Sequence, residues 1–373
     1  MKRSLALLSF SLLALSACSP AGTGDTGPIK IGYIGPLTGD AASYGVDTLN
    51  GTKMKVDEIN AAGGINGRQI ELITEDGKCA GAEAASAAQK LVNVDKVIAI
   101  IGGQCSGETL AASPIVEAGK VLLISPVSSS PDVTKAGDYV FRDYPSDALK
   151  TKAMAKYFAE EKIKSVAMIS ENTDFAAAFR ASLKENLPED AIVFDEVVEP
   201  GTKDFRTLMT RLKDAKFDIF FPNAQSDAVM AAMMRQFRDQ GMQQPAISHD
   251  VADSVTLAEL APEAVEGMWV INVPTSGQGT SFETDFTAKY GAAQSTIAFA
   301  AHAYDAMGVI AEALEAGATD GTAIKDWLYT MKEYNGVVGT FSFDQNGDVV
   351  GIPYGLKQFQ QGVIKQMKGI SVD

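Results

Sequence analysis

The stretch that decides the fold runs from residue 29 to residue 76 and reads IKIGYIGPLTGDAASYGVDTLNGTKMKVDEINAAGGINGRQIELITED. Its first residues, 29–34, form a short apolar run that predicts a buried strand. Residues 44–62 follow with apolar side chains at helical spacing, and Gly63-Gly64 ends that helix. A second strand is predicted at 69–74. Strand, helix and strand in this order predict a βαβ unit and therefore a parallel sheet.

The same alternation continues to residue 331. Further strands are predicted at 97–101, 121–125, 139–141, 165–169, 191–197, 218–221, 246–248 and 268–273. Further helices are predicted at 82–93, 108–118, 148–160, 175–186, 205–213, 228–240, 282–290, 296–316 and 323–331. Two such runs predict an α/β protein with two doubly wound parallel-sheet lobes. Ligands of such sheets lie beyond the carboxyl ends of the strands, which directs attention to the loops that follow them.

The first eighteen residues have the pattern of an export signal. Lys2 and Arg3 precede an apolar run, 5–15, that is shorter than the roughly 20 residues a membrane-spanning helix needs. Leu15-Ser16-Ala17-Cys18 matches the lipobox of bacterial lipoproteins, in which Cys18 becomes the lipidated first residue. We therefore predict a signal peptide at 1–17, a lipid anchor at Cys18 and a flexible tether over 18–27. A plain secretory signal with a chance cysteine is the alternative, and no later segment is expected to cross a membrane.

Composition narrows the partners and cofactors. The formal net charge is −15, and losing Lys2 and Arg3 with the signal leaves −17, which argues against nucleic acid and against an electrostatic grip on anionic lipid. Export would place Cys79 and Cys105 where disulfides persist, so a bridge between them is predicted, with two buried thiols as the alternative. Because the chain has only two histidines and no second Cys/His cluster, no metal site and no cofactor is expected.

The loops that follow the strands of the first half are rich in small polar residues. The loop after the first strand lacks a phosphate-loop pattern, and Tyr44 either faces a ligand or packs at the lobe surface. Ser106 is either a helix N-cap or a ligand for a carboxylate, since a helix N-terminus favours an anion. Val127, Ser128 and Ser129 lie in a turn between two prolines. Together the two loops would offer several neutral donors to one small anion.

The second half places other candidates after its strands. Asp250 follows strand 246–248 and either holds a cation or caps a helix. His249 beside it either lines the cleft, with a pH response, or is structural. Gln225 follows strand 218–221, and Phe175 stands at a helix start.

Several motifs of the chain resemble one family. The opening 29–76 stretch, with its Gly-Pro-Leu-Thr-Gly, Tyr-Gly and Asn-x-x-Gly-Gly-Ile-Asn-Gly-Arg motifs, resembles the leucine/isoleucine/valine-type periplasmic binding proteins that feed ABC importers. The resemblance continues through 102–106, 125–131, 203–212 and 347–348. It implies two lobes joined by three crossovers near Ser146, Val273 and Pro353, with the ligand in a cleft between them. The implied N-terminal lobe is 28–146 with 274–353, and the implied C-terminal lobe is 147–273 with 354–373.

The resemblance also implies roles for individual residues. Ser106, the backbone of Val127 and Ser129 match the positions that hold an α-amino acid's carboxylate and help orient its ammonium. Asp250 matches the acid that takes the ammonium, where the branched-chain binders usually have Glu, and Tyr44 matches an aromatic that contacts ligand. The two cysteines that pair in the family match Cys79 and Cys105.

Two departures concern the side-chain pocket. Phe175, followed by Ala176, stands where the branched-chain binders have Tyr-Gly, and Gln225 stands where they have another Tyr. The headgroup site therefore carries over better than the side-chain pocket. Gln225 is able to pair with a polar side chain, so a polar or amide-bearing amino acid remains open beside leucine, isoleucine and valine.

The resulting hypothesis is binding without chemistry: an exported, membrane-anchored monomer captures a small solute by lobe closure and delivers it to ABC permease subunits. The first alternative is a cell-envelope regulator or sensor with the same lobes. The second is a hydrolase, which the scarcity of histidines and the absence of a Gly-x-Ser-x-Gly elbow disfavour.

Overall fold

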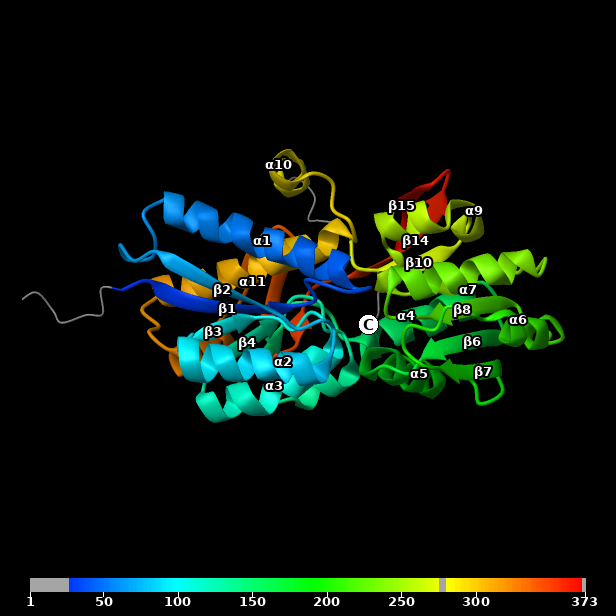
Figure 1. Ribbon diagram of the computed structural model, residues 1–373, viewed down its shortest axis with the longest axis horizontal. Helices are drawn as coiled ribbons and strands as arrows, with labels where there is room; N and C mark the ends of the chain where they lie inside the picture. The colour runs from blue at the N-terminus through cyan, green and yellow to red at the C-terminus, as the bar shows by residue number, and fades with distance from the viewer. Residues whose placement is uncertain (1–26, 275–279, 371–373) are drawn as a thin grey trace, which may run out of the picture.

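The computed structural model describes residues 27–274 and 280–370 of the 373. Two lobes lie end to end along the long axis, each built around its own sheet (Figure 1). The predicted signal peptide, Cys18 and nearly all of the predicted tether lie outside the described residues. The α/β fold with two lobes agrees with the prediction made from the strand and helix pattern.

The N-terminal lobe contains a parallel five-stranded sheet. Its order is β2-β1-β3-β4-β5. The strands are β1 (Ile29–Gly35), β2 (Ile70–Asp76), β3 (Ala99–Ile101), β4 (Leu122–Ser125) and β5 (Val140–Arg142). The helices are α1 (Ala42–Ala61), α2 (Gly81–Lys90), α3 (Ser106–Gly119), α10 (Phe282–Tyr290), α11 (Ile297–Glu315) and α12 (Gly321–Thr330). α2 and α3 cover one face of the sheet and α1 and α11 the other (Figure 1).

The C-terminal lobe contains a longer, mixed sheet. β7 (Ile192–Val198), β6 (Val166–Glu171) and β8 (Ile219–Asn223) pair in parallel in this order, and a bridge from Phe220 to Ala246 links them to β9 (Ile247–Ser248). β10 (Trp269–Asn272) is parallel to β9, whereas β14 (Tyr354–Gln360) and β15 (Val363–Ile370) complete the sheet as antiparallel strands. The helices are α4 (Asp147–Glu160), α5 (Asp174–Asn186), α6 (Arg206–Lys213), α7 (Asp227–Asp239), α8 (Val255–Leu260) and α9 (Pro262–Val265).

The chain passes between the two sheets three times. The passages lie between β5 and α4, between β10 and α10, and between β13 (Val349–Val350) and β14. Before the third passage, β11 (Tyr334–Gly336), β12 (Gly339–Phe343) and β13 form a small antiparallel sheet whose Phe341 and Phe343 pack into the core of the N-terminal lobe. These three passages are the chain connections between the two lobes.

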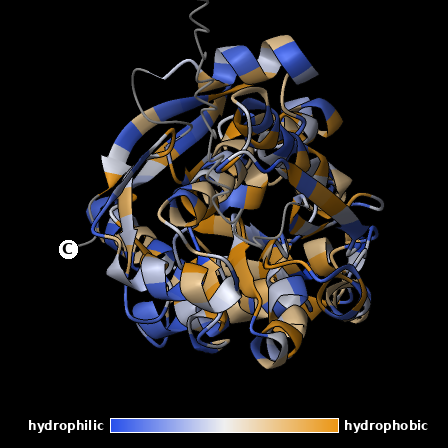
Figure 2. Ribbon diagram, turned by 90° about the vertical axis from the view of Figure 1, so that its left-hand side faces the viewer, coloured by the Kyte–Doolittle hydropathy of each residue, from blue (hydrophilic) through white to orange (hydrophobic). Residues whose placement is uncertain are grey.

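Hydrophobic residues gather at the sheet of the N-terminal lobe, and hydrophilic ones mark the outer turns of its helices (Figure 2). α1 and α11 approach closely, since a Cβ on Gly51 would lie 2.1 Å from the backbone oxygen of Ala300. α11 is also the single described helix that is long and apolar enough to cross a membrane by length and composition. Because 89% of its apolar window is buried inside the protein, α11 is a core helix.

The predicted strands through 268–273 and all the predicted helices are present, with ends that differ by a few residues. The predicted helix 82–93 instead divides into α2 and a π-helical turn, Leu91–Asp95. The sequence reading missed α8, α9 and the five strands after residue 331. The remaining short helical turns are Pro131–Lys135 and Asp250–Ala252.

The predicted disulfide between Cys79 and Cys105 is confirmed. Replacing both cysteines with serine should lower the free energy of unfolding by about 3 kcal/mol, because the bridge closes a loop of 26 residues in the unfolded chain. Urea unfolding of the oxidised protein and of the double variant measures this difference. Reductant should destabilise the wild-type protein by the same amount and leave the variant unchanged; equal stability of the two oxidised proteins would contradict the expectation.

Candidate functional site

A small cavity lies between the lobes, beyond the carboxyl ends of the strands. Its volume is about 30 Å³, whereas a single water needs roughly 10–15 Å³. The N-terminal lobe contributes Tyr44, Cys105, Ser106, Val127, Ser129 and Phe299, and the C-terminal lobe contributes Phe175, Gln225, Asp250 and Val251. The structure thus brings together seven of the eight candidate binding residues, and Ser128 is the one that does not line the cavity.

The start of α3 positions Ser106. Cys105 is the N-cap residue, and the Glu108 carboxylate accepts hydrogen bonds from the backbone N–H groups of Cys79, Gln104 and Cys105. Burial raises the pKa of Glu108 to about 7, although these N–H donors lower it. Ser106 is therefore not the N-cap that the sequence left open. Its hydroxyl oxygen accepts a hydrogen bond from the Ser130 N–H at 3.2 Å, so its own proton is available to another partner.

The serines after β4 have two different roles. The hydroxyls of Ser125 and Ser128 stabilise the turn, whereas Ser129 lines the cavity. Ser125 and Ser128 both donate to the carbonyl oxygen of Gly103, at 2.6 and 2.9 Å. The Ser128 hydroxyl also contacts Thr109 Oγ1 at 2.7 Å, which turns it into the loop and explains its absence from the cavity wall. Ser129 Oγ instead donates to Asp147 Oδ2 at 2.9 Å. Ser129 therefore lines the cavity while its hydroxyl hydrogen is already donated to Asp147.

The buried Arg142 stabilises this turn by hydrogen bonds from the side away from the cavity. Its guanidinium donates to the carbonyl oxygen of Ser130 at 2.7 Å, to Thr134 Oγ1 at 2.7 Å and to Asp348 Oδ1 at 2.6 Å. Because a planar guanidinium holds several acceptors in fixed directions, Arg142 ties the turn to the segment just before β13. Arg142 was not among the residues predicted from the sequence.

Asp250 lies on the opposite wall and is buried. The Lys150 ammonium lies 3.0 Å from its Oδ1, and His249 Nδ1 lies 3.5 Å from the same oxygen. Burial by itself would raise the pKa of Asp250, but Lys150 and His249 hold this pKa below its usual range. Asp250 is therefore an ionised carboxylate at the cavity. It begins a short helical turn without capping it, since the N-cap position belongs to His249.

His249 is packed as a structural residue. Its ring is buried against those of Phe175 and Phe179, with centroids 4.8 and 5.0 Å away, and its Nε2 pairs with Asn223 Oδ1 at 3.0 Å. His249 is not among the residues that line the cavity. Its contacts with the site are through Phe175 and Asp250, which both line the cavity.

The remaining wall is aromatic, with two unpaired polar atoms. The rings of Tyr44 and Phe299 meet edge to face at 5.9 Å, and Phe175 closes the opposite side. The Tyr44 hydroxyl and Gln225 Oε1 are buried and have no hydrogen-bond partner. The other end of the Gln225 amide, Nε2, lies 2.7 Å from the sulfur of Cys79. A buried polar atom without a partner costs about 1–3 kcal/mol, so both atoms favour a guest that pairs with them.

Direct contacts join the two lobes around the cavity. Besides the Gln225 contact with Cys79, Ser43 donates to Asp227 Oδ2 at 3.3 Å, and Lys203 lies 3.7 Å from Asp40 at the exposed rim. The buried core of the C-terminal lobe continues into Tyr44 and Phe299 of the N-terminal lobe. The cavity walls are therefore complete only when the lobes meet.

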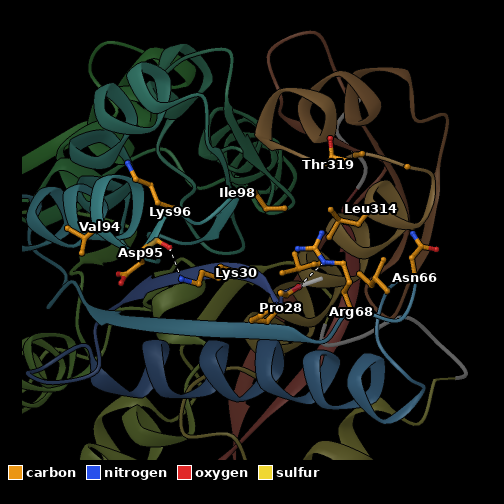
Figure 3. A pocket seen from close by; sticks show the side chains of 15 residues that line it. Pro28, Lys30, Asn66, Arg68, Val94, Asp95, Lys96, Ile98, Leu314 and Thr319 are labelled. Atoms are coloured by element: carbon orange, nitrogen blue, oxygen red, sulfur yellow. Dashed lines mark hydrogen bonds between the residues drawn. The ribbon is translucent and has the colours of Figure 1, made fainter. Parts of the chain in front are cut away.

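A larger hollow of about 750 Å³ lies at the far end of the N-terminal lobe (Figure 3). It is formed by loops at the amino ends of β1 and β3, where Lys30 Nζ donates to the backbone oxygen of Asp95 and Arg68 Nε donates to that of Gly27. Ligands of parallel sheets bind at the opposite, carboxyl ends. The smaller cavity, where polar groups of two lobes converge, is therefore the candidate site.

The described residues contain no group of three or more His, Cys, Asp or Glu side chains that could hold a metal ion. Three residues that line the cavity were not predicted to do so from the sequence: Val251, Phe299 and Cys105, which was predicted only as a disulfide partner. Asp147 and Lys150 behind the wall were not predicted either. Only the Asp147 to Lys150 spacing carried a signal, since an acid and a lysine three residues apart pair on a helix.

Comparison with known proteins places the chain in a family. The family model described as "Periplasmic binding protein" matches residues 28–358. The Leu/Ile/Val-binding protein BraC3 of Rhizobium johnstonii is 28% identical, over 96% of this chain and 98% of that protein. A leucine-, isoleucine-, valine-, threonine- and alanine-binding protein of Pseudomonas aeruginosa is 29% identical, over 89% of this chain and 90% of that protein.

A solved structure agrees with these relatives. The branched-chain amino acid transporter substrate binding protein LivJ of Streptococcus pneumoniae, in complex with isoleucine, superposes with a TM-score of 0.83 at 32% identity, covering 91% of this chain and 99% of that one. The resemblance inferred from the sequence is confirmed, and the hydrolase alternative is not supported. The chain belongs to the periplasmic binding protein family, whose members bind solutes and are not enzymes.

Proposed function

We propose that the protein captures a small α-amino acid between its lobes and delivers it to an ABC importer. The observation that carries this proposal is the arrangement of hydrogen-bond donors, acceptors and charge around the cavity. Ser106 has a free proton, Ser129 has free lone pairs, and Asp250 is an anion. These three groups match the carboxylate and the ammonium of a zwitterion and come from both lobes.

The carboxylate end is formed by neutral donors. Ser106 Oγ accepts from Ser130 N–H and so donates toward the cavity. The Val127 N–H makes one long contact, 3.4 Å to Ser125 Oγ, and supplies a second donor. Donors of this kind at the start of a helix suit an anion, because the α3 dipole adds to them.

The ammonium end is formed by Ser129 and Asp250. Because the Ser129 hydroxyl donates its hydrogen bond to Asp147, the Ser129 oxygen accepts a hydrogen bond from the ammonium of the guest. The Asp250 carboxylate supplies the charge. The resemblance placed Ser129 among the positions that hold the carboxylate and help orient the ammonium; the bond from Ser129 to Asp147 favours the second of these roles.

The side-chain end favours a short residue with a polar atom. A cavity of about 30 Å³ cannot admit any amino acid unless the lobes move slightly apart, and each added methylene would demand more movement. A side-chain hydroxyl would pair with Gln225 Oε1 or the Tyr44 hydroxyl, which an aliphatic side chain leaves unpaired. Threonine meets both conditions, and the Pseudomonas aeruginosa relative is named for threonine among its ligands.

Closure follows from where these groups stand. A zwitterion that contacts Ser106 on one lobe and Asp250 on the other binds the closed form better than the open form, and so shifts the population toward it. We propose that the lobe boundaries fall near residues 146, 273 and 353. The closed monomer would then dock on the permease, held at the membrane by a lipid on Cys18.

The test is binding of L-amino acids to the chain without residues 1–18, after copurified solute has been removed by unfolding and refolding. At 100 times the dissociation constant a bound amino acid should add about 2.7 kcal/mol to the free energy of unfolding. L-threonine should bind more tightly than its isostere L-valine, because only threonine pairs with the unpaired atoms. Absence of any response to the twenty amino acids, with stable binding to an envelope protein, would contradict transport and favour the regulator.

A further inference from the structure

A lysine is buried behind the cavity wall, between two carboxylates. Lys150 Nζ lies 2.7 Å from Asp147 Oδ1 and 3.0 Å from Asp250 Oδ1, and its side chain is 0% exposed. The ammonium also lies 5.5 Å from the centroid of the Tyr144 ring, within the range of a cation–π contact. All three charges are removed from water, which is costly unless each finds a partner.

Lys150 and Asp147 do not line the cavity; they reach it through other residues. Lys150 holds one oxygen of Asp250, which does line it. Asp147 accepts a hydrogen bond from the hydroxyl of Ser129, which also lines the cavity. One buried cation is therefore connected to both groups that face the ammonium of a bound amino acid.

Counted over its acidic and lysine side chains alone, this cluster has two carboxylates against one ammonium. If its only purpose were to stabilise the fold, a single carboxylate would suffice to pair the lysine. The excess negative charge is complementary to one incoming ammonium, after which the cluster is neutral. A carboxylic acid without an amine would leave it unbalanced.

Other titratable groups face this cluster from the elements packed around it. They are Tyr44 on α1, Tyr144 in the first passage, His249 after β9, Tyr354 on β14 and, farther away, Asp253. Burial raises the pKa of Asp147, which the Lys150 ammonium opposes, so Asp147 is the first of the two carboxylates to take a proton as the pH falls.

We infer that Lys150 is a positioning residue for the ammonium of the bound amino acid. It keeps Asp250 ionised and directed at the cavity, and through Asp147 it turns the Ser129 hydroxyl so that its lone pairs face the same point. This inference rests on the proposed function. It adds a reason for specificity: the cluster selects ligands that carry an ammonium, and it keeps their affinity constant with pH.

The experiment measures the dissociation constants of L-threonine and L-isoleucine from pH 5 to pH 8 for the wild-type protein, Lys150→Met and Asp147→Asn. The wild-type affinity should change less than threefold over this range. In Lys150→Met the two carboxylates lose their shared cation and hold a proton between them, so affinity should fall at least tenfold more than in the wild type from pH 8 to pH 5. Asp147→Asn keeps an acceptor for Ser129 but balances Lys150 completely, so affinity should fall about tenfold at every pH.

Lys152→Met is the matched control, because Lys152 is exposed on the same helix; it should behave as the wild type. A loss in Lys150→Met that is equal at all pH values would show a structural role only and overturn the inference. If Lys150→Met does not fold, the Asp147→Asn profile decides, and unchanged affinity there overturns it. Failure of the wild-type protein to bind any amino acid would instead overturn the proposed function itself.

Discussion

Asp250→Asn should weaken binding of L-threonine at least 30-fold. Asp250 supplies the negative charge at the cavity and is buried, so the ammonium of a zwitterion would lose its counter-charge without gaining water. Truncating one partner of a buried charge pair costs 2–5 kcal/mol, which corresponds to a 30-fold to several-thousand-fold loss of affinity. Asparagine keeps the shape of the side chain, and Lys150 keeps Asp147 as a partner. Calorimetric titration at pH 7.5 measures the effect.

Two comparisons separate this charge effect from damage to the fold. Asp214→Asn makes the same change at an exposed site at the end of α6 and should leave the affinity unchanged. L-valine and its 2-hydroxy analogue, which lacks the ammonium, should differ strongly in affinity for the wild-type protein and only weakly for Asp250→Asn. An Asp250→Asn protein that still prefers the amine by the wild-type ratio would refute the assignment.

Ser106→Ala should weaken L-threonine binding by about 10- to 150-fold, the range that corresponds to the 1.5–3 kcal/mol of a hydrogen bond to a charged group. The reason is that Ser106 is the cavity serine whose proton is not already committed, whereas Ser129 donates to Asp147. Ser128→Ala is the matched control. Its hydroxyl is equally buried and lies in the facing loop, but it is bonded to Gly103 and Thr109.

The control should lose about 1 kcal/mol of stability and less than threefold in affinity. Both proteins are compared by titration and by urea unfolding. Equal losses of affinity in the two variants would mean that the loops act as a scaffold, and would remove Ser106 from the carboxylate end.

The fold was largely predictable because its signals are local. Short apolar runs, helices with apolar stripes and Gly63-Gly64 at the end of α1 specify a βαβ unit without reference to the rest of the chain. The hairpin of β14 and β15 was missed, although Gln361-Gly362 takes positive φ values at its turn and alternating residues flank it. Amphipathic alternation in an exposed strand such as β15 is weaker than the continuous apolar run of a buried parallel strand.

The site was predictable in part. The motifs that resemble the family located the cavity residues on both lobes, because those residues follow strands at fixed places in the chain. The direction of each hydroxyl was not readable, since Ser128 and Ser129 are chemically the same and differ only in their neighbours, Gly103 and Asp147. Lys150 was missed because a charged residue near a helix start is normally solvated, and its burial depends on Asp250 a hundred residues later.

A crystal structure of the chain grown with saturating L-threonine should show the amino acid in the cavity between the lobes. Its carboxylate should lie within hydrogen-bond distance of Ser106 Oγ and the Val127 N–H, and its ammonium between Ser129 Oγ and the Asp250 carboxylate. Threonine bound away from the space between the lobes, or bound there with its two charged ends exchanged, would contradict the account.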